Sequence, residues 1–71
     1  MSEYKYNIGD KVRFRTNYFM DDTCASLEGK VFTITGQTWS NGPAYRVNLP
    51  VYFPLRDYYI FSEDAFVGKV D

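Results

Sequence analysis

Alternating apolar and polar residues predict the first strand of this chain. In the stretch KVRFRT, residues 11–16, Val12 and Phe14 fall on one face and the basic residues fall on the other. A period of two is typical of a strand with one buried face. Residues 7–10, which read NIGD, have turn-forming composition, so we expect the chain to turn just before this strand.

The next strands follow from residue type and from turn signals. Residues 29–39 are rich in β-branched and aromatic side chains and predict a second strand with a bend or bulge at Gly36. Asn41-Gly42 then accepts the positive φ angles of a tight hairpin turn, which leads into a third strand at residues 44–49. Two further strands are predicted at residues 56–61 and 67–70.

The segments between these strands read as loops or turns. Residues 17–29 show no clean period and predict a long loop. Pro50 and Pro54 deny ladder hydrogen bonds, so the stretch between them is an edge or a loop. The stretch SEDAF, residues 62–66, begins with a capping-type serine and is followed by acids, which favours one short helical turn.

Composition points to a curled sheet with an aromatic core. The chain has 71 residues, 20% of them aromatic, no histidine and one cysteine, Cys24. One small domain spanning residues 1–71 is expected, with large rings carrying the core. Residues 1–6 are expected to be loose, and the alternative is that Tyr4 and Tyr6 pack against the domain. Because a small open sheet leaves two exposed edges, the fold class predicted is all-β, a small five-stranded barrel with one short helical turn near the C-terminus.

The order of these stretches resembles the Src-homology-3-like small β-barrels, and among them the KOW-related type. The matching stretches are IGDKVRF (8–14), LEGKVFTITG (27–36), AYRVNL (44–49) and IFSEDAF (60–66). The resemblance implies a barrel fold and leaves the role open, because this architecture hosts many functions. The first loop lacks the glycines of the KOW pattern, and the ALYDY motif of proline-rich-peptide binders is missing.

Several function classes are disfavoured by what the chain lacks. Without histidine there is no ordinary general base at neutral pH, and Cys24 follows two acids that suppress its thiolate, so we expect no enzyme and no cofactor. Asp21, Asp22 and Glu28 lack the alternating order of a calcium loop, so no metal site is expected. No apolar stretch is long enough to span a bilayer, and the lone cysteine favours a reducing, cytoplasmic setting.

A basic strand face supplies one candidate site. Lys11, Arg13 and Arg15 share one side of the first strand, and Arg46 lies on the third. Such a face can track phosphates and bind nucleic acid. Outward strand positions are ordinarily charged, however, and cross-strand pairs with acids explain the same pattern.

Apolar loops supply the favoured site. Tyr18, Phe19 and Met20 open the long loop, and Tyr52 and Phe53 lie in the proline-framed segment. These side chains either plug the barrel or meet a partner, in which case Arg56 and Asp57 form a polar rim.

We therefore expect a non-catalytic protein-binding module. Compact barrels that stand alone are common in phages and mobile elements, which favours a regulator or inhibitor of a partner protein. The alternatives are a nucleic-acid-binding barrel and a homodimeric structural subunit, in which two copies complete a marginal core.

Overall fold

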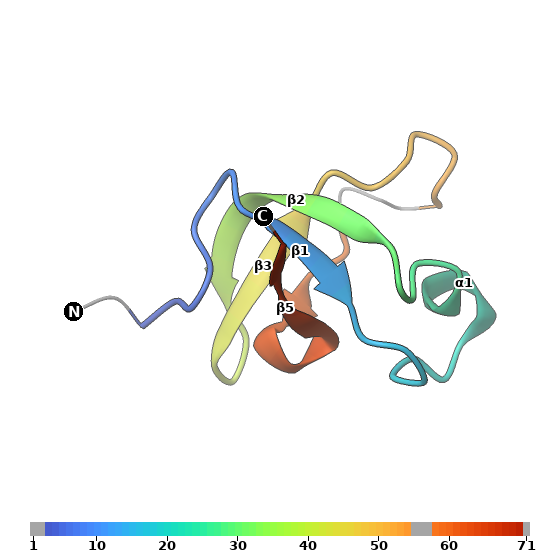
Figure 1. Ribbon diagram of the computed structural model, residues 1–71, viewed down its shortest axis with the longest axis horizontal. Helices are drawn as coiled ribbons and strands as arrows, with labels where there is room; N and C mark the ends of the chain where they lie inside the picture. Colours follow the sequence, from blue (N-terminus) through green and yellow to red (C-terminus); the bar gives the residue numbers. More distant parts are fainter. Residues whose placement is uncertain (1–2, 55–57, 71) are drawn as a thin grey trace.

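The predicted all-β architecture is confirmed. The structure, a computed structural model, describes residues 3–54 and 58–70, and its strands form one antiparallel sheet in the order β4-β3-β2-β1-β5 (Figure 1). The strands are β1 (Lys11–Phe14), β2 (Val31–Trp39), β3 (Pro43–Val47), β4 (Phe61–Ser62) and β5 (Phe66–Val70).

The hairpin between β2 and β3 forms as the Asn-Gly signal predicts. Asn41 and Gly42 have φ angles of 55° and 138°, the left-handed region that this dipeptide tolerates. The predicted irregularity near Gly36 is also present, because the β2–β3 register shifts between Ile34 and Gly36. Gly36 then faces the side chain of Arg46 across the ladder.

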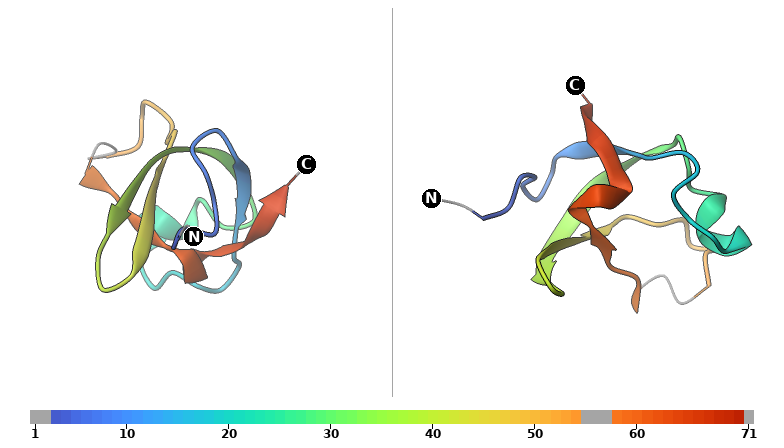
Figure 2. Two further views of the ribbon diagram at one scale, coloured as in Figure 1. Left: turned by 90° about the vertical axis from the view of Figure 1, so that its left-hand side faces the viewer. Right: turned by 90° about the horizontal axis from the view of Figure 1, so that it is seen from below.

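The sheet curls strongly, and its two outer strands are neighbours in sequence. The short 3-10 helix η2 (Glu63–Ala65) joins β4 to β5, which confirms the predicted helical turn at residues 62–66 (Figure 2). Within residues 3–54 and 58–70, no ladder pairs β4 with β5. The sheet is therefore curled without being closed, and the predicted barrel closure is not confirmed.

Two predicted segments differ in detail from the structure. The long loop at 17–29 contains a short helix, α1 (Asp22–Ala25), because the Asp21 carboxylate accepts the backbone N–H of Cys24 and caps it. Among the described residues the fourth strand is Phe61–Ser62, which pairs with β3, while the Tyr59 ring packs against Phe53 and Phe61; residues 56 and 57 of the predicted strand lie outside the described residues.

Phe14 lies at the centre of the core. Its ring packs against those of Phe61 and Phe66 at centroid distances of 4.9 and 5.0 Å. Val12 and Phe14 are both 0% exposed, as the alternation in residues 11–16 predicts. The Phe14–Phe61 pair is edge-to-face and the Phe14–Phe66 pair is tilted, and such ring pairs stabilise the fold beyond the area they bury.

The segment preceding β1 is packed on this core. Residues 1–6 are predicted to be loose, yet Tyr6 is only 2% exposed and Tyr4 packs against the core cluster. For Tyr4 and Tyr6 the structure shows the packed alternative, because these tyrosines have aromatic partners on the sheet and a carboxylate of η2 accepts the backbone N–H of Lys5.

Candidate functional site

The loop that follows β1 is held by a single carboxylate. Glu28 accepts the backbone N–H groups of Tyr18 and Phe19, each at 3.0 Å. The hydrogen bond from Phe19 is the main reason that the pKa of Glu28 lies below its usual value, and the bonds from Asn17 and Tyr18 lower it further. The loop backbone is thus tied down on its inner side.

Phe19 and Met20 point in opposite directions from this loop. The Phe19 ring lies half-buried against Phe14 and Phe61, at 5.6 and 5.9 Å. Met20 is fully exposed, at 102% of its reference area, while Tyr18 is 38% exposed and its hydroxyl contacts that of Ser62. Of the three predicted anchors here, Met20 is the fully accessible one.

The proline-framed segment makes a tight turn. The backbone N–H of Phe53 donates to the carbonyl of Pro50 at 2.9 Å, which places Val51 and Tyr52 at the two corners. These corner side chains are 82% and 80% exposed, whereas Phe53 is 5% exposed and packs on Tyr59 at 5.1 Å.

The plug interpretation holds for Phe53, while the exposure of its neighbours leaves the interface interpretation as a prediction for them. Phe53 is a core plug and leaves the set of predicted anchors, because its ring is enclosed. Tyr52 stays in the set and Val51 joins it; the framing prolines are the sequence signal of a turn that projects both residues. The predicted rim residues Arg56 and Asp57 lie outside the described residues.

Both loops lie at one end of the molecule. Residues 17–25 and 50–54 sit at the end opposite the N-terminal segment, on the right in Figure 1, and the view from below in Figure 2 agrees. We call the exposed side chains of Met20, Val51 and Tyr52 the loop-end surface. In each of the two loops a phenylalanine next to the exposed residues packs on the core: Phe19 beside Met20, and Phe53 beside Tyr52.

Two arginines of the basic face form hydrogen bonds with backbone carbonyls of the fold. Lys11 and Arg13 are exposed on β1, and Arg15 is exposed directly after it, as predicted. Arg13 donates to the carbonyl of Gly29 at 2.8 Å, and Arg15 donates to the carbonyls of Asp64 and Phe66 at 3.0 and 3.3 Å. Arg46 is exposed on β3, which β2 separates from β1.

Cys24 is a buried thiol on α1. It is 5% exposed, and burial is the main reason that its pKa is raised, with the nearby Asp21 carboxylate raising it further. Of the two acids identified in the sequence, Asp21 thus acts on the thiol in the expected direction, which disfavours the reactive thiolate.

Other site types find no support among residues 3–54 and 58–70. No group of three acidic or cysteine side chains gathers there to hold a metal, and no pocket is found. No helix in the described part of the chain has the length and apolar character to cross a membrane. The comparisons with known proteins give no match: no protein-family model, curated protein or solved structure matches this chain.

Proposed function

We propose that this chain is a non-catalytic protein-binding module that contacts its partner through the loop-end surface. The observation that carries the proposal is the exposure of Met20, Val51 and Tyr52, three large apolar side chains at one end of a small domain. Tyr and Met are enriched at the centres of protein interfaces.

The way these side chains are held also supports binding. The inward rings of Phe19 and Phe53, together with the Glu28 hydrogen bonds, restrain the two loops before any partner arrives. A restrained loop loses less conformational entropy on docking, so more of the contact energy appears as affinity.

The finer fold assignment belongs to the same proposal. The curled sheet, with its outer strands joined through η2, supports the Src-homology-3-like class of small barrels. In this setting the module acts as a regulator or inhibitor of a partner protein, in a phage or mobile element, and the lone buried Cys24 suits a cytoplasmic location.

Comparative affinity capture from cells of the source organism tests the proposal. The bait is the full chain, compared with a Met20→Ser/Tyr52→Ser double variant and with Ile8→Ser, which changes a 63% exposed apolar residue in the turn before β1. All three should fold, since exposed substitutions change stability little. We expect one partner protein to be retained by the wild type and Ile8→Ser and lost by the double variant, and then confirmed by titration of the purified pair.

Equal capture by all three baits would contradict the proposal. Sedimentation of the same proteins at micromolar concentration distinguishes the homodimer alternative, in which the wild type is a dimer and the double variant a monomer. The nucleic-acid alternative is less well supported, because Arg13 and Arg15 already bond backbone carbonyls. It predicts binding to DNA or RNA that weakens steeply with salt.

A further inference from the structure

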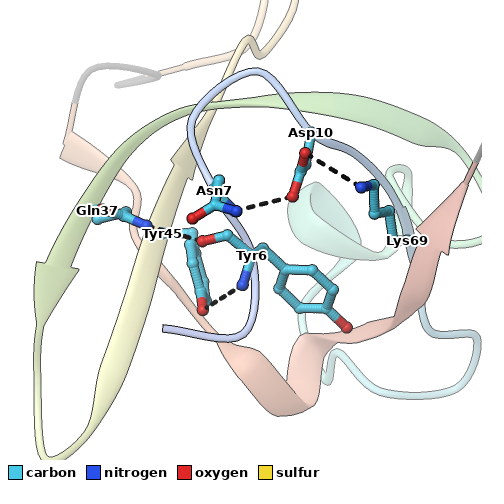
Figure 3. A network of polar contacts seen from close by, with 6 residues as sticks. All are labelled: Tyr6, Asn7, Asp10, Gln37, Tyr45 and Lys69. Carbon is cyan, nitrogen blue, oxygen red and sulfur yellow. Dashed lines mark hydrogen bonds and ion pairs between the residues drawn. The ribbon is translucent and has the colours of Figure 1, made fainter. Parts of the chain in front are cut away.

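The N-terminal segment is held on the sheet much as a peptide ligand is held in a groove. We call Tyr4, Lys5 and Tyr6 the strap; it belongs to no strand. The backbone N–H of Tyr6 donates to the hydroxyl of Tyr45 at 3.1 Å, and its carbonyl accepts from the side-chain amide of Gln37 at 2.7 Å (Figure 3). Side chains of the sheet therefore form hydrogen bonds with both the N–H and the carbonyl of Tyr6.

The carboxylate of Glu63 fixes the orientation of the Tyr45 hydroxyl that contacts the strap. It accepts the Tyr45 hydroxyl at 2.8 Å and the backbone N–H of Lys5 at 3.3 Å. Because the Tyr45 proton is committed to Glu63, the Tyr45 oxygen is oriented to accept from Tyr6. Burial, reinforced by Glu63, raises the pKa of Tyr45 and keeps that proton in place.

Both strap rings pack on aromatic surface. Tyr6 meets Tyr45 and Phe66 edge-on at 5.5 and 5.8 Å. Tyr4 meets Trp39 edge-on at 6.4 Å, and Trp39 remains 55% exposed beside it. The Lys5 ammonium lies over the Tyr6 ring, 5.6 Å from its centre.

We propose that the slot formed by Gln37, Tyr45, Glu63 and Phe66 is a peptide-binding site that the strap closes, and that its ligand is a Tyr-X-Tyr segment of a partner protein in the bent conformation of the strap. Peptide-recognition sites combine hydrogen bonds to the ligand backbone with contacts to its side chains, and the strap makes both kinds of contact. We infer the ligand sequence from the strap itself, because its residues Tyr-Lys-Tyr make all the contacts described above.

The turn before β1 sets where a release of the strap would end. Gly9, with φ of 98°, lies in this turn, and its backbone N–H donates to the carbonyl of Ile34 at 2.8 Å. The backbone N–H of Ile34 in turn donates to the carbonyl of Asp10 at 2.8 Å, so the chain is anchored to β2 from Gly9 onward. The slot lies at the end of the molecule away from the loop-end surface, so the two binding proposals stand or fall separately.

Peptide titration into the full chain tests the slot. The probe is a peptide of residues 3–8, EYKYNI, with both ends blocked, and the readout is the fluorescence of Trp39, the only tryptophan. We expect saturable binding to a Tyr6→Ala variant and binding about tenfold or more weaker to the wild type, whose strap occupies the slot most of the time. The same peptide with serine for its second tyrosine should not bind.

Absence of saturable binding to folded Tyr6→Ala would overturn the proposal, as would equal binding of the serine peptide. Should Tyr6→Ala fail to fold, hydrogen exchange of the wild type decides. The Tyr6 amide should then exchange about tenfold or more faster than the Ile34 amide, through local opening of the strap. Equal rates would mean that the strap leaves only on global unfolding, and the slot would be no binding site.

Discussion

Tyr6 and Tyr52 are both tyrosines in segments without regular secondary structure, but one side chain is buried and the other is exposed. Tyr6 is 2% exposed and Tyr52 is 80% exposed. The difference lies in the backbone: the polar groups of Tyr6 are received by Tyr45 and Gln37 on the sheet, whereas the turn around Tyr52 closes on itself between Pro50 and Phe53. A segment is buried when the fold can satisfy its backbone, and a self-satisfied turn projects its corners into solvent.

The largest expected effect comes from truncating each tyrosine in turn. Tyr6→Ala should lower the free energy of unfolding by about 3 kcal/mol, because it removes an enclosed ring. Tyr52→Ala should change it by no more than about 0.5 kcal/mol, as an exposed position does. Urea unfolding followed by circular dichroism measures both. Equal losses in the two variants would break the comparison.

Removing one hydroxyl should have a smaller effect at the strap. Tyr45→Phe keeps the ring but leaves the Tyr6 N–H and the Glu63 carboxylate without their shared partner, which should cost about 1–2 kcal/mol. The control is Tyr58→Phe, at a position that is 79% exposed, and it should be neutral. The same urea titrations apply, and a neutral Tyr45→Phe would show that the hydroxyl does not hold the strap.

Acid should loosen the loop-end surface through Glu28. Its pKa is lowered in the folded chain, so its stabilisation is complete above the ordinary glutamate pKa of about 4.3 and is lost as pH falls through the lowered value. The amide resonances of Tyr18 and Phe19 should therefore shift together in an NMR pH titration that extends below the ordinary value. In Glu28→Gln this transition should vanish, and its persistence there would assign it to another acid.

The smallest expected effect concerns the thiol beneath the loops. Because Cys24 is buried and its pKa is raised, iodoacetamide at neutral pH should alkylate the folded chain far more slowly than the chain in urea. Mass spectrometry over time measures the rate. Similar rates in both states would indicate that the loop end opens readily, which conflicts with restrained loops.

The sequence predicts most of the sheet because its signals are local. Alternation at Val12 and Phe14, the Asn41-Gly42 turn and the bulge near Gly36 each depend on a few neighbouring residues, and all are found. The burial of Tyr6 depends on Tyr45 and Gln37, which lie far along the chain, so no local pattern reveals it.

The candidate site is predictable only in part for the same reason. The prolines indicate that residues 51–53 form a turn, but which ring faces inward is decided by Tyr59, which receives Phe53. Likewise, Phe19 and Met20 are equally apolar in sequence, and the position of Phe61 beside the loop selects Phe19 for the core.

The contrast between the two ends is tested most directly by dye-sensitised nuclear polarisation of the aromatic rings, which enhances NMR signals only of accessible tyrosines and tryptophan. In the wild-type chain we expect strong signals from Tyr52, Tyr58 and Trp39 and none from Tyr6 and Tyr45. A silent Tyr52, or a strong signal from Tyr6, would contradict the account.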